Sequence, residues 1–188
     1  MNVTEPVPAM IQRKITPAAH LPIKPQSEQK QRNINAAIVH WNAKQGYLSH
    51  LGYHNGRILI HEPGLYYIYA KTCFRFYYNL DSNSESVSGT DSSLDSLLEV
   101  QTLQGGVQLF QYVYNERLIH SSPVRVVLLM RSGSTQRWNQ DTYHMCCQQQ
   151  GGVFALRSGD GLYVNVSNSW MLDPDAEGSY FGTFRISE

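Results

Sequence analysis

Short runs that alternate between apolar and polar residues follow one another along most of this 188-residue chain. Alternation with a period of two is typical of β-strands, whereas no long run shows a convincing 3.6-residue period with helix caps. The pattern predicts strands over Ala18–Ile23, Ala36–Trp41, Gly46–Leu51, Arg57–His61, Gly64–Phe76, Val107–Tyr114, Val124–Arg131, Tyr143–Gln149, Leu162–Val166 and Ser179–Ile186. Turn-forming pairs such as Asn55-Gly56 separate these runs, which favours an all-β sandwich or barrel.

The run Gly64–Phe76 is unusual because both of its faces are apolar or aromatic. One face carries Leu65, Tyr67, Tyr69, Lys71, Cys73 and Arg75, and the other carries Tyr66, Ile68, Ala70, Thr72, Phe74 and Phe76. A strand in a sandwich needs only one buried face, and the last strand, with Tyr180 and Phe184 opposite Phe181, has the same character. A second copy of the chain is the simplest cover for this patch, although tyrosines can also line a sheet with their hydroxyls in water.

The run Leu162–Val166 has apolar residues on one face only. We therefore expect its sheet to face water, with Asn165 on the wet side. Asn165 begins the sequon Asn165-Val166-Ser167, so it is a glycosylation candidate if the protein is secreted.

Two segments lack the alternation. Residues 1–17 combine several prolines with polar residues and indicate a flexible leader or stalk end, so the folded domain is expected over 18–188. Residues 77–104 include "DSNSESVSGTDSSLDS", in which seven of sixteen residues are serine. This composition predicts a long, disordered loop.

Composition and motifs give little support to several classes of function. The chain has 15 basic and 15 acidic residues, so charge gives no reason to expect a nucleic acid or an anionic membrane surface as partner. We find no nucleophile elbow, no His-Glu-x-x-His motif and no phosphate-binding loop, and so expect neither an enzyme nor a cofactor. His144 and Cys146 share one strand face, but two ligands are too few for zinc, so we expect no metal.

Membrane and export signals are absent from the printed stretch. Its apolar runs are too short to span a bilayer, and "MNVTEPVPAMIQRK" lacks the apolar segment of a secretory signal. Either the export signal is missing from this stretch, or the protein is cytosolic.

Several segments, in order along the chain, resemble the tumour necrosis factor homology domain. They are "AHL" at 19–21, Trp41, "GRILIHEPGLYYIYAKTCFRF" at 56–76, "GGVFALRSGDGLYVNVS" at 151–167 and "YFGTFRI" at 180–186. The resemblance implies a jelly-roll β-sandwich that forms a homotrimer, made as a type II membrane protein or shed from one. Within the family, "IHEPGLYYIYAKTCFRF" is similar to the TRAIL branch, whereas "GSTQRW" at 133–138 and "LDPD" at 172–175 are similar to the RANKL branch.

The resemblance also assigns residues to two surfaces. It places the trimer interface at Tyr67, Tyr69, Tyr180, Phe184 and the axis position Gln149. It places receptor contacts, in the grooves between subunits, at Leu118 or Ile119, Asp173, Asp175, Arg137 and Trp138. Two alternatives stay open: the Leu118-Ile119 pair could pack back onto the sandwich, and the two aspartates could be turn residues that bond to nearby backbone.

The resemblance makes two statements about cysteine chemistry. TRAIL binds zinc at the threefold axis through a cysteine before a tryptophan, but here Arg137 precedes Trp138, so we expect no such zinc. The family's strand pairing brings Cys73 and Cys147 to one face, which makes a disulfide between them possible. Free, buried thiols are the alternative.

The function implied by the resemblance is recognition. We expect an extracellular trimeric cytokine that binds and clusters receptors of the tumour necrosis factor receptor family, with TRAIL-like induction of apoptosis favoured. RANKL-like signalling for survival or differentiation through NF-κB is the first alternative. A C1q-like trimeric binding module is the second, but residues 1–17 show no collagen-like Gly-X-Y repeat.

Overall fold

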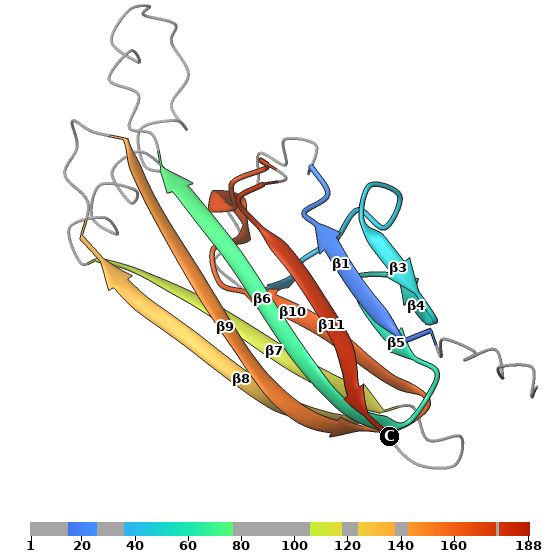
Figure 1. Ribbon diagram of the computed structural model, residues 1–188. Coiled ribbons are helices and arrows are strands. Elements are labelled where there is room, and N and C mark those ends of the chain that lie inside the picture. The colour runs from blue at the N-terminus through green and yellow to red at the C-terminus, as the bar shows by residue number, and fades with distance from the viewer. Residues whose placement is uncertain (1–14, 26–35, 77–105, 118–123, 138–142, 176) are drawn as a thin grey trace, which may run out of the picture.

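Two antiparallel β-sheets packed face to face form the protein (Figure 1). The computed structural model describes residues 15–25, 36–76, 106–117, 124–137, 143–175 and 177–188. The front sheet contains, in spatial order, β3 (Tyr47–Ser49), β1 (Ala18–Pro22), β11 (Tyr180–Ser187), β6 (Gly64–Phe76) and β9 (His144–Leu156). The rear sheet contains β4 (Leu51–His54), β5 (Arg57–Ile60), β10 (Asp160–Val166), β7 (Val107–Arg117) and β8 (Arg125–Gln136), and β2 (Ala37–Ile38) also pairs with β10.

The sequence pattern predicted most of these strands but not all of their ends. Strand β6 has the predicted bounds, whereas β7, β8 and β9 end three, five and seven residues beyond their predicted ends, at Arg117, Gln136 and Leu156. Strand β4 was not predicted. It follows β3 after His50, whose φ of 55° lies in the left-handed region and turns the chain between the two strands.

Alternate residues of the facing strands fill the space between the sheets. The predicted inner face of β6 is the buried one, because Tyr66, Ile68 and Phe74 have no exposed surface. Trp41 and Phe181 join the same cluster, with their ring centroids 5.6 Å apart. Burial of this apolar surface is the main favourable contribution to folding.

A polar patch lies inside the sandwich where β6 and β9 face β7. The side chain of Gln111 is fully buried and donates to Thr72 Oγ1 at 2.8 Å, while Gln150 Nε2 donates to Gln111 Oε1 at 2.8 Å. Gln148 Nε2 donates to the carbonyl of Leu109 at 2.6 Å. These bonds offset most of the desolvation of the buried amides, while Gln148 Oε1 is buried with no hydrogen-bond partner among the described residues.

The prediction that the face of Asn165 is open to water is wrong. Asn165 is half-buried, and its Oδ1 is inaccessible and without a hydrogen-bond partner in the described part of the chain. It lies directly opposite Ile38 of β2 and Tyr112 of β7, whose side chains share its face of the sheet and flank it. Glycosylation at Asn165 stays a prediction, and the burial of this side chain disfavours it.

Cys73 and Cys147 lie directly opposite each other on β6 and β9 and form a disulfide. Cys146, the neighbour of Cys147, points to the other face of the sheet and is a free thiol. The bond joins residues 74 apart in sequence, so it restricts a long stretch of the unfolded chain.

We expect a free-thiol assay on the unreduced, denatured protein to count one thiol. Cys147→Ser should raise the count to two and lower the free energy of unfolding by about 2–4 kcal/mol, because the unfolded chain gains freedom. Cys146→Ser is the matched control and should remove the remaining thiol with a smaller loss of stability. Three thiols in the wild-type protein would contradict the disulfide.

Candidate oligomer interface and receptor-binding residues

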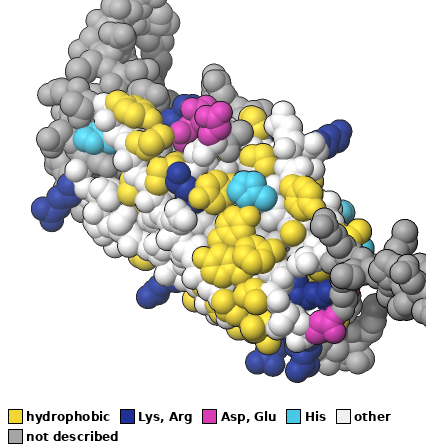
Figure 2. All heavy atoms as spheres, viewed as in Figure 1, with side chains coloured by type: hydrophobic (Ala, Val, Ile, Leu, Met, Phe, Trp, Pro, Cys, Tyr) yellow, Lys and Arg dark blue, Asp and Glu magenta, His cyan; other side chains and the backbone are white. Residues whose placement is uncertain are grey.

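An aromatic cluster covers the outer side of the front sheet. It consists of Tyr67 and Tyr69 on β6 and Tyr180 and Phe184 on β11, and we call it the aromatic face. Ring centroids lie 5.5 Å apart for Tyr67 and Phe184, 6.0 Å for Tyr67 and Tyr69, and 6.1 Å for Tyr69 and Tyr180. Figure 2 shows hydrophobic side chains gathered in a broad patch across this sheet. The structure therefore brings together four of the five residues predicted for the trimer interface.

Glycines opposite Tyr69 allow its ring to lie flat on the sheet. Tyr69 pairs with Gly182 on β11 and Gly151 on β9. A Cβ atom at Gly182 would collide with the Tyr69 ring, and one at Gly151 would collide with the ring of Tyr67. The missing side chains therefore make room for the tyrosines and leave a smooth aromatic surface.

His20 on β1 extends the aromatic face. Its Nδ1 lies 2.8 Å from the Tyr69 hydroxyl, and its ring centroid is 5.1 Å from that of Tyr180. Partial burial raises the pKa of the Tyr69 hydroxyl, and the nearby Tyr180 raises it further. Tyr69 thus stays neutral at physiological pH, which suits a surface that becomes buried.

Apolar side chains around the aromatic face are exposed in the single chain. Phe184 is 42% exposed, Val153 on β9 is 49% exposed, and Ile186 on β11 is 51% exposed. Gln149, the predicted axis residue, is also exposed on the outer side of β9. A contiguous apolar surface of this kind marks an interaction site in soluble proteins.

A second exposed apolar surface lies on β8, the edge strand of the rear sheet. Val126, Val127 and Leu128 follow one another there, and each is exposed. We call these three residues the apolar edge. Edge strands normally carry charges or prolines because an uncovered apolar edge aggregates. This signal is present in the sequence as "RVVLLM" at 125–130, where alternation alone predicts only a strand.

The predicted receptor-binding residues fall into three groups. Leu118, Ile119 and Trp138 lie outside the described residues. Arg137 is exposed at the end of β8, and Asp175 is also exposed. These two side chains are free to contact a partner.

Asp173 is different because it is only 2% exposed. Its Oδ1 lies 3.3 Å from Arg75 Nη1 and accepts the backbone N–H of Asp175 at 3.2 Å. Its own N–H donates to the carbonyl of Cys73 at 2.8 Å. Asp173 therefore behaves as a turn residue whose side chain bonds to nearby backbone, which was the alternative to a receptor contact. Its hydrogen bond to the N–H of Asp175 holds the segment on which Asp175 is exposed.

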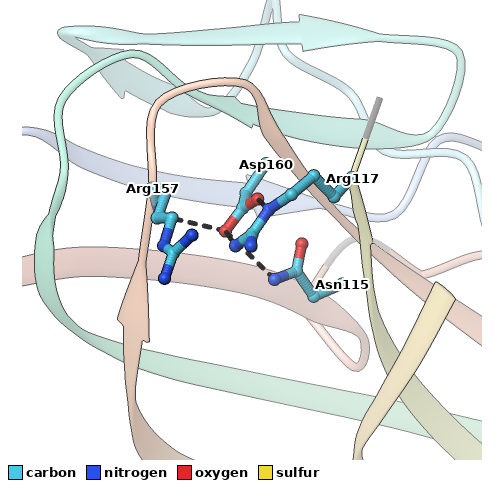
Figure 3. Close-up of polar contacts among 4 residues, drawn as sticks. All are labelled: Asn115, Arg117, Arg157 and Asp160. Atoms are coloured by element: carbon cyan, nitrogen blue, oxygen red, sulfur yellow. Dashed lines mark hydrogen bonds and ion pairs between the residues drawn. The ribbon is translucent and has the colours of Figure 1, made fainter. Parts of the chain in front are cut away.

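A charged cluster at the lower end of the sandwich was not predicted (Figure 3). Asp160, at the start of β10, is fully buried and accepts from Arg117 Nε at 2.6 Å and Arg117 Nη2 at 2.8 Å. Asn115 Nδ2 and the backbone N–H of Arg157 also donate to it, at 3.1 and 3.0 Å. Burial alone would raise the pKa of Asp160, but these hydrogen bonds outweigh it and hold the pKa below its ordinary value.

No group of three metal-binding side chains occurs in the described part of the chain. Among the same residues, no helix is long and apolar enough to cross a bilayer.

Comparison with known proteins matches the model of the TNF (Tumour Necrosis Factor) family to residues 39–186. The chain belongs to the tumour necrosis factor family. It is 32% identical over 160 residues to "Tumor necrosis factor ligand superfamily member 10" of Mus musculus, covering 83% of this chain and 49% of that protein. It is 30% identical over 176 residues to member 11 of Homo sapiens, covering 92% of this chain and 48% of that protein.

Membership of the tumour necrosis factor family confirms the resemblance and agrees with the jelly-roll sandwich and with the interpretation that the chain is not an enzyme. The chain spans about half the length of the curated relatives it matches. The roles of individual residues and the domain bounds stay predictions.

We expect Asp160→Asn to lower the free energy of unfolding at pH 7 by on the order of 3 kcal/mol, because it leaves Arg117 without its buried partner. The pKa of Asp160 is lower in the folded state than in the unfolded state. The ionised carboxylate therefore contributes its full share to the free energy of unfolding above the unfolded pKa of about 3.9, and this share is lost as the pH falls through the folded pKa. Urea unfolding across this pH range should therefore show a flatter profile for Asp160→Asn than for the wild type. Asp175→Asn, at an exposed carboxylate, is the control and should keep the wild-type slope.

Proposed function

We propose that this protein is an extracellular cytokine ligand that assembles as a homotrimer and clusters receptors of the tumour necrosis factor receptor family. One observation carries the proposal: the chain has two different uncovered apolar surfaces, the aromatic face and the apolar edge. Contact between unlike surfaces is heterologous, and such contacts close into a ring when the rotation permits. The family resemblance supports three subunits in that ring.

Assembly gives each exposed surface a cover. If the apolar edge of one subunit packs on the aromatic face of the next, Val127 and Phe184 leave water together. Tyr69 and Tyr180 then lose their remaining contact with solvent. A trimer also presents three equal grooves, so a receptor bound in one raises the effective concentration for receptors at the others on a cell surface.

Among receptor outcomes, we favour TRAIL-like induction of apoptosis through a death-domain receptor. The segment "IHEPGLYYIYAKTCFRF" supports this choice. The RANKL-like alternative, differentiation or survival signalling, has its own support in "LDPD" at 172–175, where Asp175 is exposed. The type II membrane ectodomain or a shed soluble form is the proposed location.

We expect light scattering of the protein at micromolar concentration to give the mass of three chains. Phe184→Asp should reduce it to the mass of one folded chain, because a carboxylate would be buried without a partner. Leu59→Asp, on the outer side of the rear sheet, is the matched control and should keep the trimer mass. A folded wild-type protein with the mass of one chain would contradict the proposal.

Receptor binding tests the second part of the proposal. We expect one or more ectodomains of a tumour necrosis factor receptor panel to capture the trimer, and the Leu118→Ala plus Ile119→Ala double variant to bind about 30-fold more weakly, as for a hot spot. Asp175→Ala and Arg137→Ala should each have smaller effects, and Leu59→Ala should have none. Capture of the double variant at wild-type affinity would overturn the anchor assignment.

A further inference from the structure

Beside the aromatic face lies a side chain that changes its charge within the physiological pH range. His20 is exposed on the outer side of β1, and its ring centroid lies 5.8 Å from that of Tyr69 and 5.1 Å from that of Tyr180. A histidine side chain gains or loses its proton between about pH 5 and 8. In the proposed trimer the next subunit covers this surface, so a change of charge at His20 would take place inside the subunit contact.

The hydrogen bonds available to His20 favour its neutral form. Its Nδ1 lies 2.8 Å from the Tyr69 hydroxyl, so a neutral imidazole can accept the hydroxyl proton there. A protonated imidazole has no acceptor atom, and the hydroxyl would then have to donate to the carbonyl of Ala19 at 3.5 Å, near the outer limit of a hydrogen bond. Burial raises the pKa of the Tyr69 hydroxyl, so this group offers His20 no negative charge.

The ionisable groups around His20 give a protonated imidazole little compensation. Tyr47 lies directly opposite it on β3, and Lys71 on β6 has its Nζ 5.8 Å from the centre of the Tyr180 ring. A cation is therefore already present at this ring. Glu177 is the one carboxylate among the described residues that line the surface hollow beside His20, but it is exposed, so solvent screens its attraction.

The strand proposed to cover this surface adds no negative charge. Strand β8, Arg125–Gln136, contains no acidic residue, and Arg125 and Arg131 stand on either side of the apolar edge. A protonated His20 would therefore enter the contact without an ion-pair partner from β8. Burial of a charge without a partner costs much more than burial of a neutral imidazole.

We propose that His20 makes assembly of the trimer sensitive to pH: the neutral imidazole permits the subunit contact, and protonation below about pH 6 weakens it. The inference rests on the proposed trimer and adds its regulation. Because the separated chains bind protons better than the trimer does, a fall in pH shifts the equilibrium toward separated chains. Each trimer holds three copies of His20, so the penalties of the three sites multiply in the dissociation constant.

Subunit exchange between trimers that carry donor and acceptor dyes tests the proposal on the intact chain. We expect energy transfer to appear at least about tenfold faster at pH 5.5 than at pH 7.4, because His20 is protonated at the lower pH. The fold should persist at pH 5.5, since the lowered pKa of Asp160 keeps its carboxylate ionised there, and intrinsic fluorescence checks this. Equal exchange rates at the two pH values would overturn the proposal.

Variants assign the effect to His20. His20→Gln keeps an acceptor for Tyr69 but takes no proton, so its ratio of the two exchange rates should fall to about one. His20→Phe keeps the ring contacts and gives the same readout if the first variant does not assemble. His54→Gln, at an exposed histidine on β4, is the matched control and should keep the wild-type ratio.

Two results separate this inference from the proposed function. A wild-type protein with the mass of one folded chain at pH 7.4 would contradict the trimer and this inference with it. A trimer whose exchange ratio survives His20→Gln and His20→Phe, or falls equally in His54→Gln, would overturn only the role of His20.

Discussion

Two apolar faces on strand β6 constrain the rest of the molecule. The inner face, with Ile68 and Phe74, is satisfied within one chain because the rear sheet covers it. The outer face, with Tyr67 and Tyr69, has no cover among the described residues. Exposed rings of this kind favour association, because burying them releases the water that surrounds them. The receptor proposal therefore depends on the same physical effect that folds the sandwich.

The aromatic face also explains why small residues occur beside it. Gly151 and Gly182 flank Tyr69 on the neighbouring strands, and neither position has room for a side chain. Glycine weakens an isolated strand because it has no side chain to pack. Here that cost is offset by the rings that lie over the glycines, so sequence, strand pairing and surface shape are linked at this position.

The sequence predicted the fold best where alternation was strong and uninterrupted, as in Gly64–Phe76. It predicted the end of β9 too early because Gly151 and Gly152 interrupt the apolar pattern, although the pairing with β6 continues to Leu156. The face of Asn165 was misjudged because its neighbours β2 and β7 cannot be identified from the alternation of one strand.

The candidate sites were predictable to different degrees. The aromatic face followed from side-chain periodicity together with the family resemblance. The cluster around Asp160 did not, because Arg117 lies 43 residues from Asp160 and neither residue belongs to a motif. Asp160 stands between two glycines in "SGDG", a sequence typical of a turn, and its burial and its ion pair with Arg117 depend on the folded structure.

The position of the disulfide has a consequence for how the chain reaches its native pairing. Cys146 and Cys147 are adjacent, so oxidation to the wrong one would shift β9 by a single residue against β6. Such a slip exchanges the two sides of a strand. The polar Gln148 and Gln150 would then turn outward, and Val153 would turn inward. If the disulfide forms before β6 and β9 have paired, a bond to Cys146 would hold β9 in this shifted register. If it forms after they have paired, the bond to Cys147 stabilises the native register.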